Sequence, residues 1–251
     1  MTIDGINVAI AAGGRIDGAF AVETGTEVKA LAPIGASTIL ERTIDAAAAL
    51  GARRIVVLGD AAVAARCDDR VERILPDNGN GAANMLACLR AFREDTERSA
   101  TLLLAGDLPF LDAASLLRYI EAVAAPVVAL GICTGVEYEA RFPGAPVNGV
   151  MLRGERIVNA GALLVPHSAI DAVAGESAAF FNARKYPWRM AMRAGLGILA
   201  AHAIGRLGLE QIERRASRVL GSAVAAIRSC PPELCFDVDS VDEYRYARAH
   251  T

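Results

Sequence analysis

The stretch "TLLLAGDLPFLD", residues 101–112, decides the fold class of this 251-residue chain. Four apolar or β-branched residues run through Ala105 and Gly106 into a carboxylate, Asp107. A short continuous apolar run of this kind indicates a strand that is buried on both faces, as in parallel sheets covered by helices. We therefore expect Asp107 to lie where this strand leaves the core.

Similar apolar runs alternate with segments of helical period along the chain, a pattern typical of an α/β fold with a mostly parallel sheet. The expected strands are 6–12, 54–59, 101–106, 126–132, 147–153, 157–165 and 235–239. The expected helices are 37–50, 82–94, 113–123, 187–204, 209–220 and 241–249. No repeat or low-complexity linker interrupts the pattern, so we expect a single domain spanning residues 1–251.

Composition excludes several classes of protein. The net charge of -3 argues against a nucleic-acid partner, because proteins that track phosphates carry a basic face. Five cysteines without a Cys-x-x-Cys motif predict reduced thiols in a cytoplasmic protein. The longest apolar run, residues 194–205, is shorter than the ~20 residues of a membrane span. We expect no transmembrane segment and no membrane contact, and the sequence leaves a homodimer open.

A glycine-rich turn, "AIAAGGRIDGAF" at residues 9–20, follows the first expected strand. Gly13 and Gly14 would let backbone N–H groups approach a phosphate, although a simple tight turn would use the same residues. The turn is neither a dinucleotide fingerprint nor a P-loop, because Arg15 stands in place of the second glycine and no Gly-Lys-Ser/Thr follows. Lys29 is one of two lysines against twenty-four arginines. Its retention suits a compact charge near phosphates, and chance explains it equally well.

The order of several segments carries a family resemblance. "VAIAAGGR…VKALAPIGASTILERTIDAA", "RIVVLGD", "LPDNGNGAANMLACLRAF" and "LLLAGDLPFLDAASL" together resemble the MobA-like NTP transferase family. Near the C-terminus, "FDVDSVDEYRYAR" is similar to that family's Asp-x-Asp/Asn-Thr-Pro-Glu-Asp-Leu ending. The sequence departs from the family in two places. The loop between Arg15 and Lys29 is longer, and residues 180–220 have no counterpart in the family's core pattern, so we expect an added helical element there.

The resemblance implies a GT-A-like fold of three layers, with a mostly parallel sheet between helices. It also implies that an NTP binds over the glycine-rich loop with Mg²⁺, and that a small phosphorylated or hydroxylated acceptor attacks the α-phosphorus with release of pyrophosphate. The implied catalytic residues are Arg15, Lys29 and Asp107, and the implied metal ligands are Asp107 with Asp237 or Asp239. The nucleotide-binding candidates are Ala12, Gly13, Gly14, Arg15, Lys29, Asn80, Gly81 and Asn84. The acceptor-binding candidates are Asn159, Gly161 and Lys185.

The aspartates suit this chemistry, because Mg²⁺ prefers oxygen ligands and often takes one or two carboxylates together with phosphates. An N-cap is the other role open to Asp107. Asp112 is the better cap, since it directly precedes the next helix and Pro109 separates Asp107 from that helix. Either Asp237 or Asp239 also suits a cap of the last helix.

Three further segments have structural alternatives. "LPDNGNGAANML", residues 75–86, fits a loop around a nucleobase, and equally an ordinary turn with an Asn cap. Asn159 and Gly161 interrupt a strand, where a bulge is the structural alternative. The basic stretch around Lys185 suits an acceptor phosphate, a dimer contact or an anionic surface, although a helix packed on the sheet is the plainer interpretation.

Two other functions stay open at this point. A glycosyltransferase of the same fold class would hold its metal with an Asp-x-Asp motif, whereas Ala105 and Gly106 precede Asp107 here. A nucleotide-binding regulator without turnover is the other alternative, motivated by the long loop after Arg15 and by the helical addition.

Overall fold

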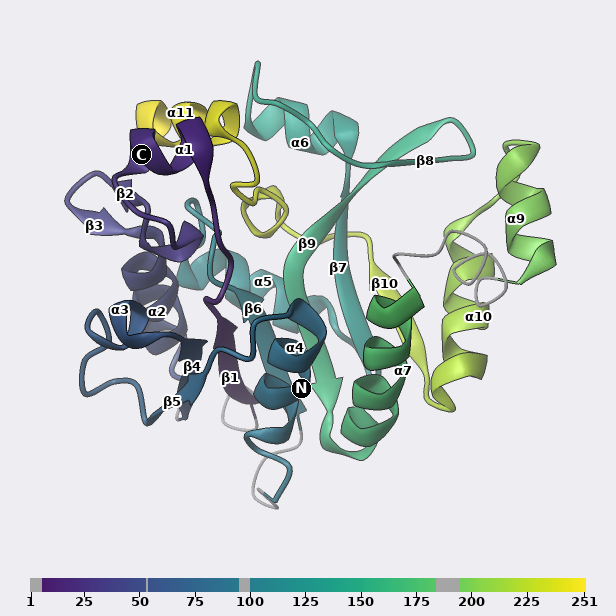
Figure 1. Cartoon of the computed structure of the whole chain (residues 1–251). Coiled ribbons are helices and arrows are strands. Elements are labelled where there is room, and N and C mark those ends of the chain that lie inside the picture. The colour runs from purple at the N-terminus through teal and green to yellow at the C-terminus, as the bar shows by residue number, and fades with distance from the viewer. Residues whose placement is uncertain (1–5, 53, 95–99, 184–194) are drawn as a thin grey trace.

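The computed structural model describes residues 6–52, 54–94, 100–183 and 195–251. Within these ranges an eight-stranded sheet has the order β10-β7-β9-β6-β1-β4-β5, and β8 pairs with β9 (Figure 1). The strands are β1 Ile6–Ala11, β4 Ile55–Gly59, β5 Arg73–Pro76, β6 Ala100–Ala105, β7 Val128–Thr134, β8 Val150–Leu152, β9 Glu155–Pro166 and β10 Val224–Ile227. A separate two-stranded sheet joins β2 Pro33–Ile34 to β3 Ser37–Thr38.

The sheet is mixed but mostly parallel. β6 pairs in parallel with β1 and antiparallel with β9, which also pairs antiparallel with β7. A tight hairpin joins β8 to β9. Its two connecting residues, Arg153 and Gly154, both have positive φ, at 48° and 83°, as a two-residue hairpin of the favoured twist requires.

Helices cover both faces of the sheet, as expected. α2 (Ile39–Ala49) and α5 (Ala113–Ala122) contribute to the hydrophobic core on one face. α4 (Gly81–Arg90) and α7 (Ile170–Ala183) pack against each other on the other face. The remaining helices are α1 Gly18–Thr24, α3 Ala61–Ala64, α6 Gly135–Arg141, α9 Leu196–Ala203, α10 Leu209–Leu220 and α11 Val241–His250, with 3-10 turns η2 Lys29–Leu31, η3 His167–Ala169 and η4 Pro232–Leu234. The expected three-layer α/β fold is confirmed.

The expected strand at 235–239 is wrong. Residues 236–239 are irregular in structure and follow the 3-10 turn η4. Pro231 and Pro232 lead into this turn, and the N–H groups of Leu234 and Cys235 donate back to the carbonyls of Pro231 and Pro232 rather than to a neighbouring strand. Instead the backbone N–H of Val238 donates a single hydrogen bond of 3.2 Å to the carbonyl of Asp107.

Other differences concern short or weakly patterned elements. β5 is an exposed edge strand, and β10 contains two alanines among four residues, so neither has a strong strand pattern. The expected helix at 187–204 falls partly outside the described residues, and its described part is α9. None of the described helices is long and apolar enough to cross a membrane.

Candidate active site

Asp107 lies in the turn that follows β6, directly against the glycine-rich loop. Gly106 makes this approach feasible, because a Cβ there would lie 3.0 Å from both the Ala11 oxygen and the Ala12 Cα. The Gly106 N–H also donates to the Ala11 carbonyl at 3.0 Å. The strand therefore delivers the Asp107 carboxyl to the edge of the sheet beside the turn that ends β1.

The helix cap in this region is Asp112, as predicted. Its side chain accepts a 2.7 Å hydrogen bond from the Ser115 N–H, and the Ser115 hydroxyl closes a capping box at the start of α5. The cap role is therefore filled without Asp107, whose carboxyl has other partners.

The long loop between Arg15 and Lys29 closes on itself. Arg15 and Val28 form an isolated antiparallel bridge, and the Ile16 N–H donates to the Glu27 carbonyl at 3.0 Å. α1 forms the tip of the loop. The Lys29 N–H then donates to the Gly14 carbonyl at 2.9 Å, so the extra length loops out and Lys29 still lies beside the glycines.

The Lys29 ammonium joins two carboxylates from distant parts of the chain. Its Nζ lies 2.9 Å from Asp107 Oδ2 and also forms an ion pair with Asp239. The side chains of Lys29 and Asp107 are 15% and 17% exposed, whereas that of Asp239 is 57% exposed. Burial by itself lowers the pKa of Lys29, but the attraction of Asp107 and Asp239 outweighs it and raises the pKa above its usual value. Lys29 is therefore a permanent cation at this site.

The segment that carries Asp239 is held by Glu243, a residue that sequence reasoning missed. Glu243 is buried, and its Oε2 accepts hydrogen bonds from the Asp239 N–H at 2.8 Å and the Ser240 hydroxyl at 2.9 Å. Its Oε1 accepts from the Asn148 side-chain amide at 2.8 Å. The signal in the sequence was the Ser-x-x-Glu spacing at the start of α11, which predicts a capping box.

Negative charge is concentrated around Asp237. Burial, together with the nearby carboxylates of Asp107 and Asp239, raises the pKa of its carboxyl to about 7 despite the opposing attraction of Lys29. Asp107 Oδ1 is buried and lacks a hydrogen-bond partner among the described residues. An orphaned carboxylate oxygen and crowded acids fit a divalent cation, which would satisfy both. In the described ranges, no three His, Cys, Asp or Glu side chains are already gathered as a metal centre.

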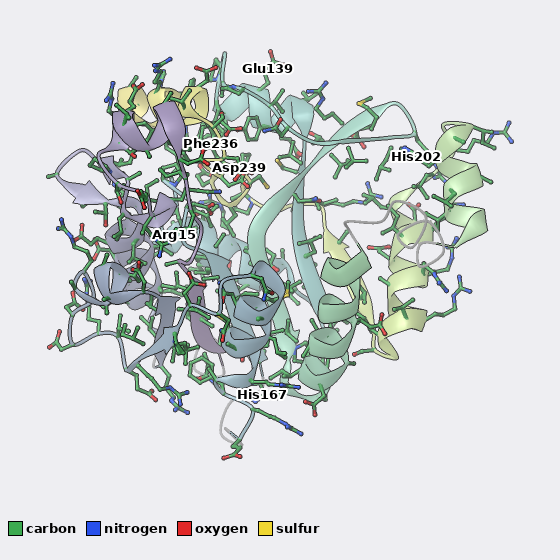
Figure 2. All side chains as sticks on the ribbon, in the orientation of Figure 1. Arg15, Glu139, His167, His202, Phe236 and Asp239 are labelled. Carbon is green, nitrogen blue, oxygen red and sulfur yellow. The ribbon has the colours of Figure 1, made fainter. Side chains whose placement is uncertain are left out.

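Arg15 lies near the same end of the sheet but contacts a different carboxylate. Its Nη2 donates to Asp60 Oδ2 at 2.7 Å, and Figure 2 shows Arg15 and Asp239 at that end. Asp60 caps α3, and hydrogen bonds from the Val63 N–H and from Arg15 lower the pKa of Asp60. His167 follows β9 at the opposite end, where Pro166 pairs with the first residue of β6. Arg15 therefore pairs with Asp60, whereas Lys29 pairs with Asp107 and Asp239.

The loop before α4 is built by its own polar side chains. Asn80 accepts from the Ala83 N–H at 2.8 Å and caps α4, whose first residue is Gly81. The buried Asn84 donates to Asp77 Oδ1 at 2.9 Å and accepts from the Asn78 N–H at 2.8 Å. The cap alternative thus holds for Asn80, and a nucleotide contact of either amide stays a prediction.

This loop touches the glycine-rich turn. A Cβ on Gly13 would lie 2.8 Å from Asn84 Nδ2 and 3.1 Å from Asp77 Cγ, so only glycine fits there without a shift. On Gly14 a Cβ would make ordinary contact with Lys29 at 3.6 Å. Asp77 was missed as a site residue, although the Asp-Asn-Gly run is typical of a turn closed by a side-chain carboxylate.

The acceptor candidates lie on β9 or outside the described residues. Gly161 packs against the turn after β6, because a Cβ there would lie 2.8 Å from Leu108 Cδ2. Asn159 is exposed and pairs in register with Ile132, next to a register irregularity of β7. The bulge alternative is therefore present in the structure. Lys185 lies outside the described residues.

These features define a class of protein. A mostly parallel sheet brings a glycine-rich turn, a lysine and several carboxylates together at the carboxyl ends of its strands, where open α/β sheets bind their ligands. The model of the MobA-like NTP transferase domain matches residues 9–152, more than half of the chain, so the protein belongs to the MobA-like NTP transferase family. It is a nucleotidyltransferase.

Solved structures share the fold over nearly the whole chain. A hypothetical transferase from Thermus thermophilus is 26% identical with a TM-score of 0.81, covering 94% of this chain and 99% of its own. A 2-C-methyl-D-erythritol 4-phosphate cytidylyltransferase, also from Thermus thermophilus, is 15% identical with a TM-score of 0.56, covering 97% of each chain. A Mycobacterium tuberculosis protein solved in complex with manganese is 20% identical with a TM-score of 0.51, covering 99% of this chain and 100% of its own. A search of curated proteins finds no match.

Proposed function

We propose that this nucleotidyltransferase transfers an NMP from an NTP to a small phosphorylated or hydroxylated acceptor, with Mg²⁺, as one transferase domain. An acceptor oxygen attacks the α-phosphorus, the bond from that phosphorus to the bridging oxygen breaks, and pyrophosphate leaves. The observation that carries the proposal is the convergence of Asp107 and Asp239 on the Lys29 ammonium beside Gly14. This charge arrangement suits a triphosphate bound with a cation.

Asp107 would hold the metal together with Asp237 or Asp239. When bound, Mg²⁺ would neutralise charge on the phosphates and orient them. The chain's own residues would do the remaining work. Lys29 would turn from its carboxylate partners toward the phosphoryl oxygens, and Arg15 would do the same from Asp60. The backbone N–H groups of the glycine-rich turn would approach the phosphates without obstruction from a Cβ.

The neighbouring structures support an acceptor that carries a phosphate or a hydroxyl. The name of the Thermus cytidylyltransferase describes a phosphorylated polyol as its acceptor. Here, β9 brings Gly161 against the turn that carries Asp107, and the exposed Asn159 lies two residues away. We assign the acceptor to this strand on the basis of that proximity.

The test is pyrophosphate release from each of the four NTPs, with Mg²⁺ or with EDTA, against a panel of phosphorylated sugars, polyols and alcohols. We expect release that requires both the metal and one class of acceptor. NTP binding without pyrophosphate release over the whole panel would instead support the regulator that the sequence left open.

A further inference from the structure

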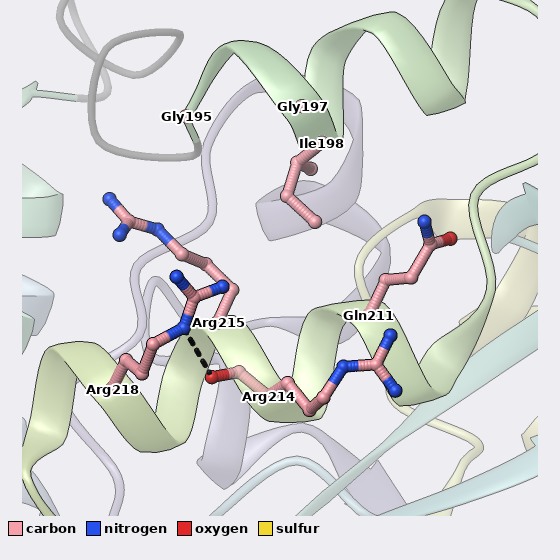
Figure 3. A pocket seen from close by; sticks show the side chains of 7 residues that line it. All are labelled: Gly195, Gly197, Ile198, Gln211, Arg214, Arg215 and Arg218. Carbon is pink, nitrogen blue, oxygen red and sulfur yellow. Dashed lines mark hydrogen bonds between the residues drawn. The ribbon is translucent and has the colours of Figure 1, made fainter.

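A polar pocket lies between α9 and α10, beside the edge strand β10 (Figure 3). Its volume is about 370 Å³, which falls in the roughly 300–1,000 Å³ range of small-molecule sites. We call it the arginine pocket; it is lined by Gly195, Gly197, Ile198, Gln211, Arg214, Arg215 and Arg218.

The arginine pocket is separate from the site around Lys29, Asp107 and Asp239, which we call the transfer centre. α10 packs on β10, and strands β9 and β7 lie between β10 and β6, whose end carries Asp107. Three steps between neighbouring strands amount to about 14 Å, before the distance out to the helix layer is added. Figure 1 likewise places α9 and α10 at the far side of the molecule from β1 and α1. A ligand here would not touch Lys29 or Asp107.

Three arginines of one helix line this pocket. In Figure 3 the side chains of Arg215 and Arg218 lie side by side below Gly195, and that of Arg214 points toward Gln211. The Arg218 Nε donates to the Arg214 carbonyl at 3.3 Å, which fixes part of the arrangement. Arg214 and Arg218 are four residues apart, a spacing at which like charges on a helix repel. An anion between the helices would relieve that repulsion.

The acids of α10 have partners away from the pocket. Glu213 Oε1 accepts a 2.7 Å hydrogen bond from the Ala226 N–H on β10. Glu210 forms ion pairs with Arg228 at 3.3 Å and Arg153 at 3.6 Å. Over the ranges that the structure covers, neither Arg214 nor Arg218 forms an ion pair. The charge of Arg214 helps to lower the pKa of Glu210, one turn earlier on α10, but within the described part of the chain neither arginine is held by a direct ion pair, so both guanidinium groups can turn to a ligand.

The opposite wall adds hydrogen-bond donors and apolar surface. α9 begins after Gly195, which supplies no side-chain cap, and the Ile198 N–H donates to the Gly195 carbonyl in its first turn. The earlier N–H groups of the helix, including that of Gly197, have no intrahelical partner. Ile198 points from α9 toward α10 and supplies the apolar side chain of the lining.

We propose that the arginine pocket binds the phosphate group of a small phosphorylated molecule, at a site distinct from the nucleotide-transfer centre. Guanidinium groups donate pairs of parallel hydrogen bonds to phosphate oxygens, and several can share one phosphate. Gln211 and the start of α9 supply neutral donors, and Ile198 contacts the body of the ligand. A soluble phosphate ester and a phospholipid headgroup present the same chemical group to this pocket.

Binding is measured by calorimetry with sn-glycerol 3-phosphate, in EDTA and without nucleotide. We expect saturable binding that weakens about tenfold or more in the double variant Arg214→Gln/Arg218→Gln, because charge-assisted hydrogen bonds are lost. Arg66→Gln, an exposed arginine near the other edge of the sheet, is the matched control and should bind like the parent. Asp107→Asn should also bind like the parent. Circular dichroism checks that each variant is folded.

A second arm distinguishes the two sources of the phosphate. Sedimentation with phosphatidylcholine vesicles, with and without phosphatidic acid, is compared between the parent and the double variant. Arginine-dependent binding to phosphatidic acid vesicles supports the pocket with a lipid as carrier, and binding to glycerol 3-phosphate alone supports it with a soluble carrier. Absence of binding in both arms, or binding that the double variant retains, overturns the proposal. Since no nucleotide is present, the result does not depend on the proposed transferase activity.

Discussion

The transfer centre and the arginine pocket hold their charges in opposite ways. At the transfer centre, Lys29 lies between Asp107 and Asp239, and the three residues come from distant parts of the chain. In the arginine pocket, the like charges of Arg214 and Arg218 come from one helix and form no ion pair in the described structure. A centre with paired charges is prepared to exchange partners when a ligand arrives. In the arginine pocket, by contrast, a bound anion would displace no ion pair, and its binding would relieve the repulsion between the two arginines.

The largest effect should come from Asp107→Asn, which tests the paired charges of the transfer centre. This variant removes the negative charge that pairs with Lys29 at the end of β6. We expect pyrophosphate release to fall by about 10²–10³-fold, as when a preorganised electrostatic contact to the transition state is lost. Release is measured under Mg²⁺ at saturating NTP, with the melting temperature as a check of folding.

The matched control for that variant is Asp112→Ala, five residues further on. It removes the cap of α5 and should cost about 1 kcal/mol of stability, with turnover retained. If Asp107→Asn turned over like the parent, the assignment of the transfer centre would be wrong.

Lys29→Met tests whether the ammonium and a divalent cation share the same carboxylates. Loss of the cation leaves the mostly buried Asp107 carboxylate unpaired, so the metal-free protein should lose on the order of 2 kcal/mol of stability. Mg²⁺ should then raise the melting temperature more in this variant than in the parent. Lys29→Arg, which keeps the charge, serves as the control, and an equal Mg²⁺ effect in all three proteins would contradict the shared site.

The pH dependence of the free energy of unfolding, measured without metal, tests the raised pKa of Asp237. The pKa of Asp237 is about 7 in the folded protein and 3.8 ordinarily, so between these values the folded state binds more protons than the unfolded state. Stability contributed by the protonated carboxyl is therefore full below pH 4 and is lost as the pH rises through 7. In EDTA at pH 8, Asp237→Asn should be more stable than the parent by on the order of 2 kcal/mol.

Urea unfolding at pH 4 and pH 8 provides the measurement for Asp237. At pH 4 the midpoints of the variant and the parent should nearly coincide, since the folded carboxyl is neutral there and the unfolded one, with its ordinary pKa of 3.8, is only about half ionised. Parallel pH profiles of the two proteins would show that Asp237 does not titrate near neutrality.

The smallest effect belongs to the arginine pocket. Arg218→Gln removes the like-charge pair with Arg214 at i, i+4, keeps the attraction between Arg214 and Glu210, and should stabilise the protein by about 0.2–0.5 kcal/mol at low salt. The gain should shrink at high salt because the repulsion is screened. Chemical denaturation at two salt concentrations measures it. Turnover should not change. A loss of turnover would show that the arginine pocket and the transfer centre are coupled.

Several features of the fold followed from local sequence. The apolar run that became β6, the Asp112 cap and the alternation of strands with helices depend on neighbours within a few residues, where propensity and pattern act directly. The irregular segment that carries Asp237 and Asp239 illustrates the limit. Its acidic residues were identified by resemblance, but its expected strand pairing is absent, because the Cys235 N–H bonds within the η4 turn and the Val238 N–H bonds to Asp107.

The polar partners of the site could not be predicted in the same way. Asp60 holds Arg15 from 45 residues away, and Glu243 positions Asp239 while it also binds Asn148. Neither contact follows from the residues near Arg15 or Asn148 alone. Arg214 and Arg218 lie on a helix that the sequence predicts. The pocket that they line, however, also requires α9 opposite them, and the position of α9 does not follow from the residues of α10.

The sequence by itself determined the α/β class, the buried strand that ends at Asp107 and the family to which the chain is similar, because these depend on short-range pattern and on the order of segments. The tertiary structure alone decided that Lys29 lies between two carboxylates despite its long loop. It did so because the Arg15–Val28 bridge closes the loop at its base and returns the chain to Gly14. The tertiary structure also decided which arginines line a pocket without a direct ion pair. The reason is that the acids of α10 already bind partners elsewhere in the fold.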